Sequence, residues 1–464
     1  MALTCLKDKL FAKAESKQGS HGTSQARALS KFMLQMNPLW SCVILVLAAM
    51  IRATAIQGLQ EDYSDYGVYR FPSENSSTLF RDVIAPLTDD YDVWTRSSKF
   101  IDIKLPKDIG EQVKEGRLII DDMNQLIQDT MPAKQVIAHD QTVFENLQEF
   151  FFSEYRDLDT IYMWLDLLER SFPNLVKLEH LGKTFEGREL KALHISGNKP
   201  ESNPEKKTII VTGGIHAREW ISVSTVCWTI YQLLTKYGSS KKETKYLDDL
   251  DFLIIPVFNP DGYAYTWSND RLWRKNRQKT HVPQCYGIDI DHSFDFQWEK
   301  AHTHACSEEY SGETPFEAWE ASAWNEYING AKGNYKIYGY IDMHSYAQEI
   351  LYPYAYSCDA LPRDLENLLE LSYGLSKAIR SRSGRIYDVI SACKDRGSDI
   401  FPGLGAGSAL DYMYHHRAHW AFQLKLRDTG NHGFLLPPEN IKPVGKEAYA
   451  ALKYFCDFLL DPEI

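Results

Sequence analysis

The sequence predicts an α/β protein in which a mainly parallel β-sheet follows a smaller α+β module. Beyond residue 155, apolar runs alternate with segments of helical patterning, and the clearest runs lie at 208–211, 252–257 and 338–342. Uninterrupted apolar runs are typical of strands buried on both faces of a parallel sheet. Before residue 132 the pattern differs, because short segments such as 101–105 alternate apolar and polar residues. Such alternation favours half-buried strands of a separate small sheet.

These patterns divide the chain of 464 residues into four parts. We expect a leader and secretory signal peptide at 1–55, a small α+β domain at 60–132, a linker at 133–150 and the main domain at 151–464. The linker contains no arginine and no dibasic pair, so a trypsin-like protease finds little to cleave there. The small domain is therefore expected to stay attached.

The expected signal peptide rests on the apolar run 39–51 and the small residues that follow it. The run is shorter than the roughly 20 residues that span a bilayer, and Ala53-Thr54-Ala55 has the small-x-small pattern that signal peptidase cleaves. A buried core helix is the alternative explanation of the run. Because the stretch before Met33 is unusually polar for a signal, Met33 or Met36 is a candidate initiator. We expect a secreted protein with no membrane span after signal removal.

Charge and cysteine content fit this expectation. A net charge of -12 without a long basic run argues against nucleic acid or an anionic membrane as the main partner. Asn75 begins a glycosylation sequon in a polar loop. Cys227 and Cys456 lie in apolar runs and are expected to be buried thiols. In an oxidising compartment, two local disulfides are expected, Cys285 with Cys306 and Cys358 with Cys393.

Three residues form a candidate metal site. His216 and Glu219 stand three apart where an apolar strand passes into a helix, and His344 ends another buried strand. Ligand sites of such sheets collect at the carboxyl ends of strands. Two imidazoles and one carboxylate are a zinc set of the catalytic type, with one coordination position left open. We therefore expect one Zn²⁺ per chain, against the alternative that these are ordinary surface side chains.

With these residues in place, the chain resembles zinc carboxypeptidases of the M14 type, the pancreatic A/B kind, from the small domain to the C-terminus. The resemblance implies a mixed, mostly parallel eight-stranded sheet flanked by helices, preceded by a small open-sandwich pro-segment. The matching stretches are Gly213–Trp220, Pro256–Tyr263, Arg271–Lys275, Gly287–Asp289, His344–Tyr346, Leu426–Gly430 and Gly433–Pro437.

The resemblance also implies roles for individual residues. His216, Glu219 and His344 would be the zinc ligands, and Asp289 would be the partner of a ligand histidine. The resemblance also places Arg274, Arg218, Ser345, Tyr346 and Leu410 in the substrate pocket. Arg274 would polarise the scissile carbonyl, and Arg218 would line the peptide subsites. Leu410 would set the side-chain preference.

Three positions depart from active members of that family. Lys425 stands where active members carry the glutamate that serves as general base, and an ammonium group has no lone pair with which to accept a proton. Asp291 and His292 replace the Asn-Arg pair that clamps the substrate carboxylate. Phe401 aligns with the mobile tyrosine that closes over substrate. The combination resembles the fungal inactive metallocarboxypeptidases associated with cell-wall organisation, which implies a vacuolar or extracellular location.

We therefore expect a zinc-binding pseudoenzyme that binds an unidentified protein or peptide in the old active-site cleft. Lys425 is expected to pair with Asp291, or to approach the open metal position in its deprotonated form. One alternative is an active metallocarboxypeptidase with an altered mechanism, in which neutral Lys425 acts as the base. Another is a structural wall protein with an empty metal site.

Overall fold

The computed structural model describes residues 60–73, 83–84, 86–88, 90–132, 151–197, 206–298, 304–330, 335–397 and 405–461. The expected signal peptide, the expected linker, Asn75 and Phe401 lie outside these ranges. Among the residues described, no helix is long and apolar enough to cross a membrane.

The N-terminal part of the described chain is a four-stranded antiparallel sheet in the order β2-β3-β1-β4. Its core faces are formed by the alternating side chains of β1 and β3, among them Phe71 and Ile103. This arrangement agrees with the period-two pattern in the sequence. The elements are β1 (Tyr66–Pro72), β2 (Asp92–Arg96), β3 (Phe100–Pro106), α5 (Lys107–Gly110), β4 (Arg117–Ile120) and α6 (Met123–Thr130).

The main sheet has eight strands in the order β11-β10-β12-β9-β7-β8-β6-β5, which confirms the predicted strand number. The four pairs β10·β11, β12·β9, β7·β9 and β7·β8 are parallel, and the other three are antiparallel. The strands are β5 (Val176–Lys183), β6 (Glu189–Ile195), β7 (Lys207–Gly213), β8 (Leu250–Ile255), β9 (Lys336–His344), β10 (Glu349–Tyr352), β11 (Asp388–Ser391) and β12 (Trp420–Lys425).

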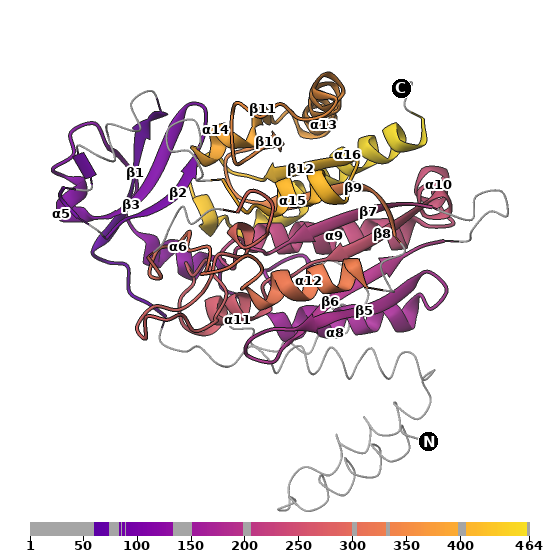
Figure 1. Cartoon of the computed structure of the whole chain (residues 1–464), viewed down its shortest axis with the longest axis horizontal. Coiled ribbons are helices and arrows are strands. Elements are labelled where there is room, and N and C mark those ends of the chain that lie inside the picture. Colours follow the sequence, from indigo (N-terminus) through magenta and orange to yellow (C-terminus); the bar gives the residue numbers. More distant parts are fainter. Residues whose placement is uncertain are drawn as a thin grey trace, which may run out of the picture. The chain divides into compact units, whose positions relative to one another are not determined.

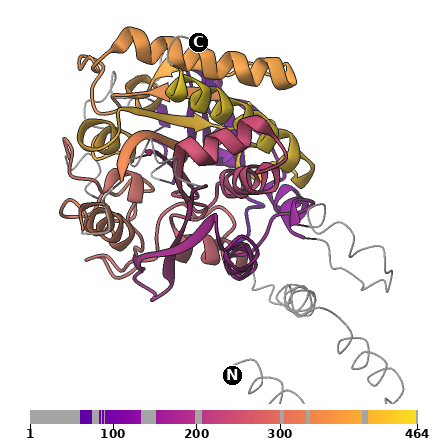
Figure 2. The same ribbon diagram turned by 90° about the vertical axis from the view of Figure 1, so that its right-hand side faces the viewer.

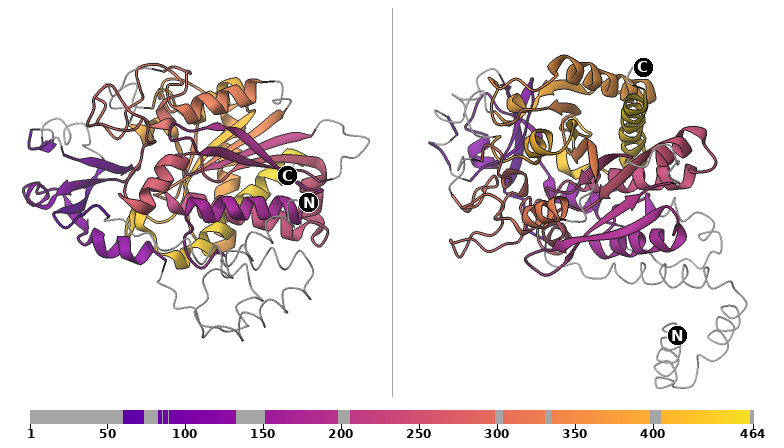
Figure 3. Two further views of the ribbon diagram at one scale, coloured as in Figure 1. Left: turned by 90° about the horizontal axis from the view of Figure 1, so that it is seen from below. Right: turned by 45° about the vertical axis from the view of Figure 1, so that its right-hand side comes forward.

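Helices flank the main sheet on both sides (Figure 3). Three of them, α9, α16 and α13, pack against one another in that order, and in Figure 2 α13 is the long orange helix along the top of the view. The mixed α/β fold predicted from the sequence is thereby confirmed. The helices are α8 (Leu158–Ser171), α9 (Trp220–Lys236), α10 (Lys241–Asp249), α11 (Pro260–Ser268), α12 (Trp319–Asn329), α13 (Leu365–Ser383), α14 (Ala392–Arg396), α15 (Ala409–His416) and α16 (Ile441–Leu460).

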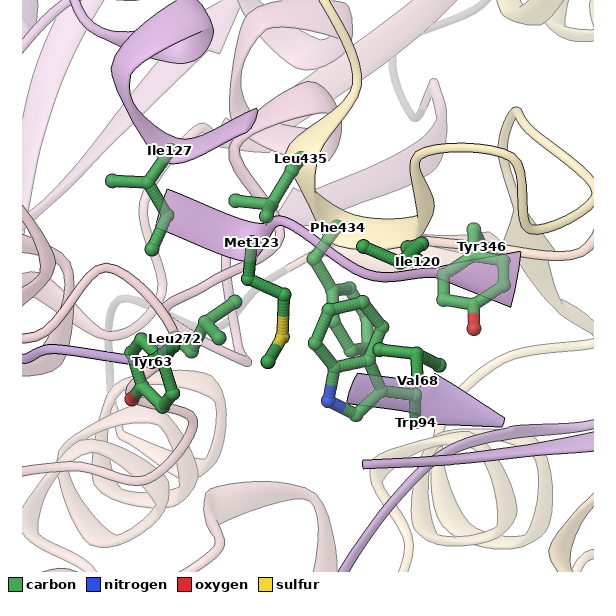
Figure 4. Packing of buried hydrophobic residues seen from close by; sticks show 10 residues of the cluster. All are labelled: Tyr63, Val68, Trp94, Ile120, Met123, Ile127, Leu272, Tyr346, Phe434 and Leu435. Carbon is green, nitrogen blue, oxygen red and sulfur yellow. The ribbon is translucent and has the colours of Figure 1, made fainter. Parts of the chain in front are cut away.

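The small sheet packs against the main domain through a buried apolar cluster. Trp94 of β2 lies with its ring centroid 5.1 Å from that of Phe434 and 6.5 Å from that of Tyr346 (Figure 4). Strand β2 also contacts α14, next to which it lies in Figure 1. Burial of aromatic side chains is the main source of such interface stability. The cluster comprises Tyr63, Val68, Trp94, Ile120, Met123, Ile127, Leu272, Tyr346, Phe434 and Leu435.

The cysteines of the main domain are placed as the sequence predicted. Cys227 and Cys456 are free and buried. The bridges join Cys285 to Cys306 and Cys358 to Cys393.

Candidate metal centre

The strand order brings the three candidate metal ligands together. Strands β7 and β9 are parallel neighbours, and Gly213 pairs with Met343 in their register, so both strands end at the same edge of the sheet. The chain then turns through Gly214, whose φ is +64° and where a Cβ would lie 2.7 Å from Val223 Cγ2. Only glycine fits this turn. It places His216 and Glu219 immediately before α9, across from His344.

One donor atom from each of His216, Glu219 and His344 lies within 4.8 Å of the others, and all three side chains are buried. Glu219 Oε1 is 2.8 Å from His216 Nδ1, and Glu219 Oε2 is 3.2 Å from His344 Nδ1. The other ring nitrogens face carboxylates: His216 Nε2 is 3.3 Å from Asp289 Oδ1, and His344 Nε2 is 2.8 Å from Asp342 Oδ2. The Nδ1 atoms are thus turned toward the centre.

Asp342 was missed by the sequence analysis. It stands two residues before His344 in β9, and residues two apart in a strand share one face of the sheet. The strand alternation in Asp342-Met343-His344 was therefore a signal that could have identified it. A carboxylate bonded to the outer nitrogen of a ligand histidine fixes the orientation of the ring.

The centre is strongly polar and shielded from water. Burial raises the pKa of the Glu219 carboxyl, but the adjacent imidazoles of His216 and His344 lower it by more than burial raises it, so the net shift of the pKa is downward. Burial lowers the pKa of His344, whereas Asp342 and Glu219 raise it, to a net value of about 10. In the same way Arg274 and His216 outweigh burial at Asp289 and hold its pKa well below the usual range. The carboxylates of Glu219 and Asp289 are therefore ionised.

Arg274 is buried and committed to Asp289. Its Nη2 and Nε atoms donate to Asp289 Oδ2 at 2.7 and 3.1 Å. Asp289 thereby links the guanidinium expected to polarise a substrate carbonyl to the candidate ligand His216.

Lys425 is turned away from the metal centre. In the register of β12 and β9 it pairs with His344, so its backbone adjoins a candidate ligand. Its ammonium, however, forms an ion pair with Asp395 of α14 and donates to Thr95 Oγ1 of β2 at 3.2 Å. The predictions that Lys425 pairs with Asp291 or approaches the metal position are both wrong. Asp395 lies 30 residues away in the chain, and no local motif indicated it.

A second carboxylate adjoins this ion pair. Glu349 of β10 is directly opposite Lys425 in the antiparallel register of β10 and β12. Its burial raises the pKa of the Glu349 carboxyl, Lys425 lowers it and Asp395 raises it, with a net value of about 8. The Lys425 ammonium thus has two buried acidic side chains near it, Asp395 and Glu349.

Asp291 and His292 face inward. The Asp291 carboxylate accepts from the backbone N–H of Ala409 at 3.0 Å and from Gln423 Nε2 at 3.2 Å. His292 Nδ1 lies 3.0 Å from the carbonyl oxygen of Ala406. Both side chains therefore tie the short helix Ile290–His292 to the start of α15.

The remaining pocket residues are also buried. The backbone N–H of Ser345 donates to Glu219 Oε2 at 2.9 Å. Tyr346 donates from its hydroxyl to Asp102 Oδ2 at 2.8 Å. Leu410 is fully buried in α15.

Arg218 is paired with the small sheet. Its Nη1 and Nη2 atoms contact the two carboxylate oxygens of Asp92 in β2 at 2.5 and 3.1 Å, and its Cζ lies 4.3 Å from the centroid of the Phe434 ring. The sequence analysis did not indicate Asp92, because the contact spans 126 residues. The arginine implied to line the peptide subsites is therefore covered by β2.

The sequence profile of the family described as Zinc carboxypeptidase matches residues 161–451, which is more than half of the chain. The chain therefore belongs to the zinc carboxypeptidase family. Within it, the chain is 84% identical over 432 residues to the protein named Inactive metallocarboxypeptidase ECM14 of Saccharomyces cerevisiae, covering 93% of this chain and 100% of that one. The protein of the same name from Uncinocarpus reesii is 40% identical over 439 residues, covering 86% of this chain and 74% of that one.

Solved structures agree with the fold. A crystal structure of thrombin activatable fibrinolysis inhibitor matches with a TM-score of 0.73 and 26% identity, over 85% of this chain and 99% of that one. Carboxypeptidase A of Helicoverpa armigera matches with a TM-score of 0.72 and 25% identity, over 85% and 97%. Both the family resemblance and the prediction of a non-catalytic homologue are confirmed: the chain is an inactive metallocarboxypeptidase homologue.

Proposed function

We propose that this protein is a secreted, zinc-binding pseudoenzyme whose inactivity has two separate chemical causes. Lys425 replaces the general base, and Asp291 with His292 replaces the clamp for a substrate carboxylate. The proposal rests on two neighbouring features at one edge of the main sheet, the candidate metal ligands and the side chain of Lys425. The ligand set His216, Glu219 and His344 is complete, while Lys425 is turned to Asp395.

The donor set fits zinc. Two imidazole nitrogens and one carboxylate oxygen are ligands that zinc prefers, and each histidine has a carboxylate behind its outer nitrogen. Zinc bound by His216, Glu219 and His344 would supply Lewis acidity at the edge of the cleft. The chain's own residues provide the orientation of the two rings and exclude water from the ligand side chains.

The loss of the base follows from the contacts of Lys425. Its ammonium donates to Asp395, Thr95 and the Arg96 carbonyl, so its hydrogen-bonding capacity is used in the direction away from the ligands. Proton acceptance in the cleft would need a carboxylate in its place, and losing a general base costs about 10² to 10⁴ in rate. Among the described contacts of the Lys425 ammonium, none supports the alternative in which neutral Lys425 acts as the base.

The loss of the clamp follows from Asp291 and His292. The Asp291 carboxylate accepts two hydrogen bonds from its own surroundings, and the His292 ring adjoins a backbone carbonyl. Neither presents the bidentate donor fork by which an arginine binds a carboxylate. Capture of a free peptide C-terminus would therefore lack its main anchoring group.

The cleft edge is covered by the protein's own small sheet, which we propose is a pro-segment-like domain of about residues 60–132. Asp92 neutralises Arg218, Thr95 accepts from Lys425, and Trp94 packs on Tyr346. A protein or peptide partner that used the old cleft would have to displace β2. Lys425 therefore takes on a new role, since it holds this strand in place.

Location and biological role are part of the proposal. The two disulfides support an oxidising compartment, in agreement with the expected signal peptide. The resemblance to fungal inactive metallocarboxypeptidases supports a vacuolar or extracellular location and a role in cell-wall organisation. Glycosylation at Asn75 is proposed on the sequon alone.

The decisive experiment measures metal content and hydrolysis on the same purified full-length protein. We expect about one zinc per chain by mass spectrometry in the wild type and none in His344→Ala, with no release of C-terminal residues from a peptide panel, before or after limited proteolysis. If the wild-type protein contains no zinc, the alternative of a structural wall protein with an empty metal site would replace this proposal. Cleavage abolished by chelation would show an active enzyme.

A further inference from the structure

A basic hollow lies at the end of the main sheet opposite the metal centre. It has a volume of about 240 Å³ and lies where β9 and β12 begin, around Tyr338 and the segment 415–419. His344 ends the same strand β9, and six residues at about 3.3 Å each separate the two places by roughly 20 Å. The hollow is therefore a separate feature from the old cleft.

The polar lining of this basic hollow consists of two arginines, which are permanently charged, and three histidines, which can take up a proton. Arg363, His415, His416, Arg417 and His419 all line it, and none of its lining residues carries a carboxylate. Within the described part of the chain, none of these five side chains forms an ion pair with a carboxylate. This concentration stands out in a protein whose net charge is -12.

Two further cations adjoin the hollow. Lys207 Nζ and Lys336 Nζ lie 4.8 and 5.8 Å from the centroid of the Tyr338 ring, which the His419 ring stacks against at 5.9 Å. Burial, and then the nearby charge of Lys336, lower the pKa of Lys207. The repulsion among these positive charges is only partly offset by Asp295, which acts on His416, and a bound anion would relieve it further.

Helix capping explains only part of this arrangement. A protonated histidine in the last turn of a helix interacts favourably with the helix dipole, and His415 and His416 lie in the last turn of α15. The carbonyls of Tyr414 and Ala418 at that helix end already accept from Arg363 Nη2 at 2.7 and 3.0 Å. The α15 dipole does not account for the remaining basic residues, because Lys207 and Lys336 begin strands β7 and β9 and His419 directly precedes β12.

The lining groups are held in place before any ligand arrives. The His415 ring stacks on Phe296 with centroids 4.1 Å apart, and His419 stacks on Tyr338. Arg417 is held by a hydrogen bond to the side chain of Asn329, and Arg363 by the helix-end carbonyls. Such preorganisation lowers the entropic cost of binding. The neutral partners leave the guanidinium charges uncompensated.

We propose that this basic hollow binds a phosphate- or sulfate-type oxyanion, either free or as the ester group of a larger ligand. Guanidinium and imidazolium groups are donors suited to such oxyanions. The site is independent of zinc and of the metal ligands.

The test is calorimetric titration of inorganic phosphate into the full-length protein at constant ionic strength. We expect saturable binding with one site per chain, weakened about tenfold or more in the Arg417→Gln/His419→Gln double variant. Both side chains are exposed, so the fold should be kept. Arg382→Gln, which removes an exposed cation of α13 outside the hollow, should bind as the wild type does. No saturable binding, or equal weakening in the control, would overturn the proposal.

Further arms separate the sources of the oxyanion. Tighter binding of glucose 6-phosphate than of inorganic phosphate would identify an ester ligand, whereas equal affinity would identify the free anion. Sulfate keeps its charge between pH 7.5 and 5.5, so tighter sulfate binding at the lower pH would assign part of the affinity to imidazolium groups. The charged groups that act on His416 in that range are His415, Arg417 and Asp295. Sulfate affinity that is the same at both pH values would remove the histidines from the site.

Discussion

Replacing Lys425 with glutamate introduces the residue type that serves as general base in active carboxypeptidases. We nevertheless expect the replacement to lower the stability of the fold and to create no peptidase activity. The side chain of Lys425 is 14% exposed and that of Asp395 is 2% exposed, so their ion pair is largely buried. Removing one partner of a buried pair costs about 3–5 kcal/mol because the other charge remains uncompensated. The introduced carboxylate would also face Asp395 and Glu349, and it would lose the hydrogen bond to Thr95.

The assay is urea denaturation of wild type and Lys425→Glu, with peptide hydrolysis measured on the same samples. At pH 7 we expect the free energy of unfolding to fall by at least about 3 kcal/mol. The matched control is Lys425→Met combined with Asp395→Asn, which removes both charges and should recover much of the loss. The deficit of Lys425→Glu should shrink as the pH falls, because crowded carboxyls have raised pKa values and become neutral. Unchanged stability, or peptide turnover in Lys425→Glu, would refute this reasoning.

Three further outcomes follow from the described contacts. Asp342→Asn should weaken zinc binding about 10- to 100-fold in a chelator competition, because the carboxylate orients His344; unchanged affinity would contradict this role. Asp92→Asn should lower the free energy of unfolding by roughly 3 kcal/mol because it removes the carboxylate that is hydrogen-bonded to the buried Arg218 guanidinium, and a stable variant would show that the pair is dispensable. The pKa of Glu349 is raised to about 8 in the folded state, so the stability that this shift contributes is fully present below about pH 4.5 and is lost as the pH rises through about 8. In Glu349→Gln the stability should therefore fall less over that pH range than in the wild type, as measured by denaturation at each pH.

The sequence by itself determined the main fold and the set of candidate metal ligands. Buried strands leave uninterrupted apolar runs, and parallel strands place their carboxyl ends at one edge, so His216, Glu219 and His344 could be assigned to one place before any coordinates. The substitution at Lys425 was visible because a motif surrounds it. Asp342 was within reach of the same reasoning, since it shares a strand face with His344.

Only the tertiary structure decided what Lys425 does. Its partners Asp395 and Thr95 are 30 and 330 residues away in the chain, on α14 and on the small sheet. Asp92, which neutralises Arg218, is likewise a long-range contact of that sheet. Periodicity and motifs describe neighbours within one element, whereas these pairs depend on how one packed unit docks against another. That docking is determined by the buried cluster around Trp94, whose members come from both units.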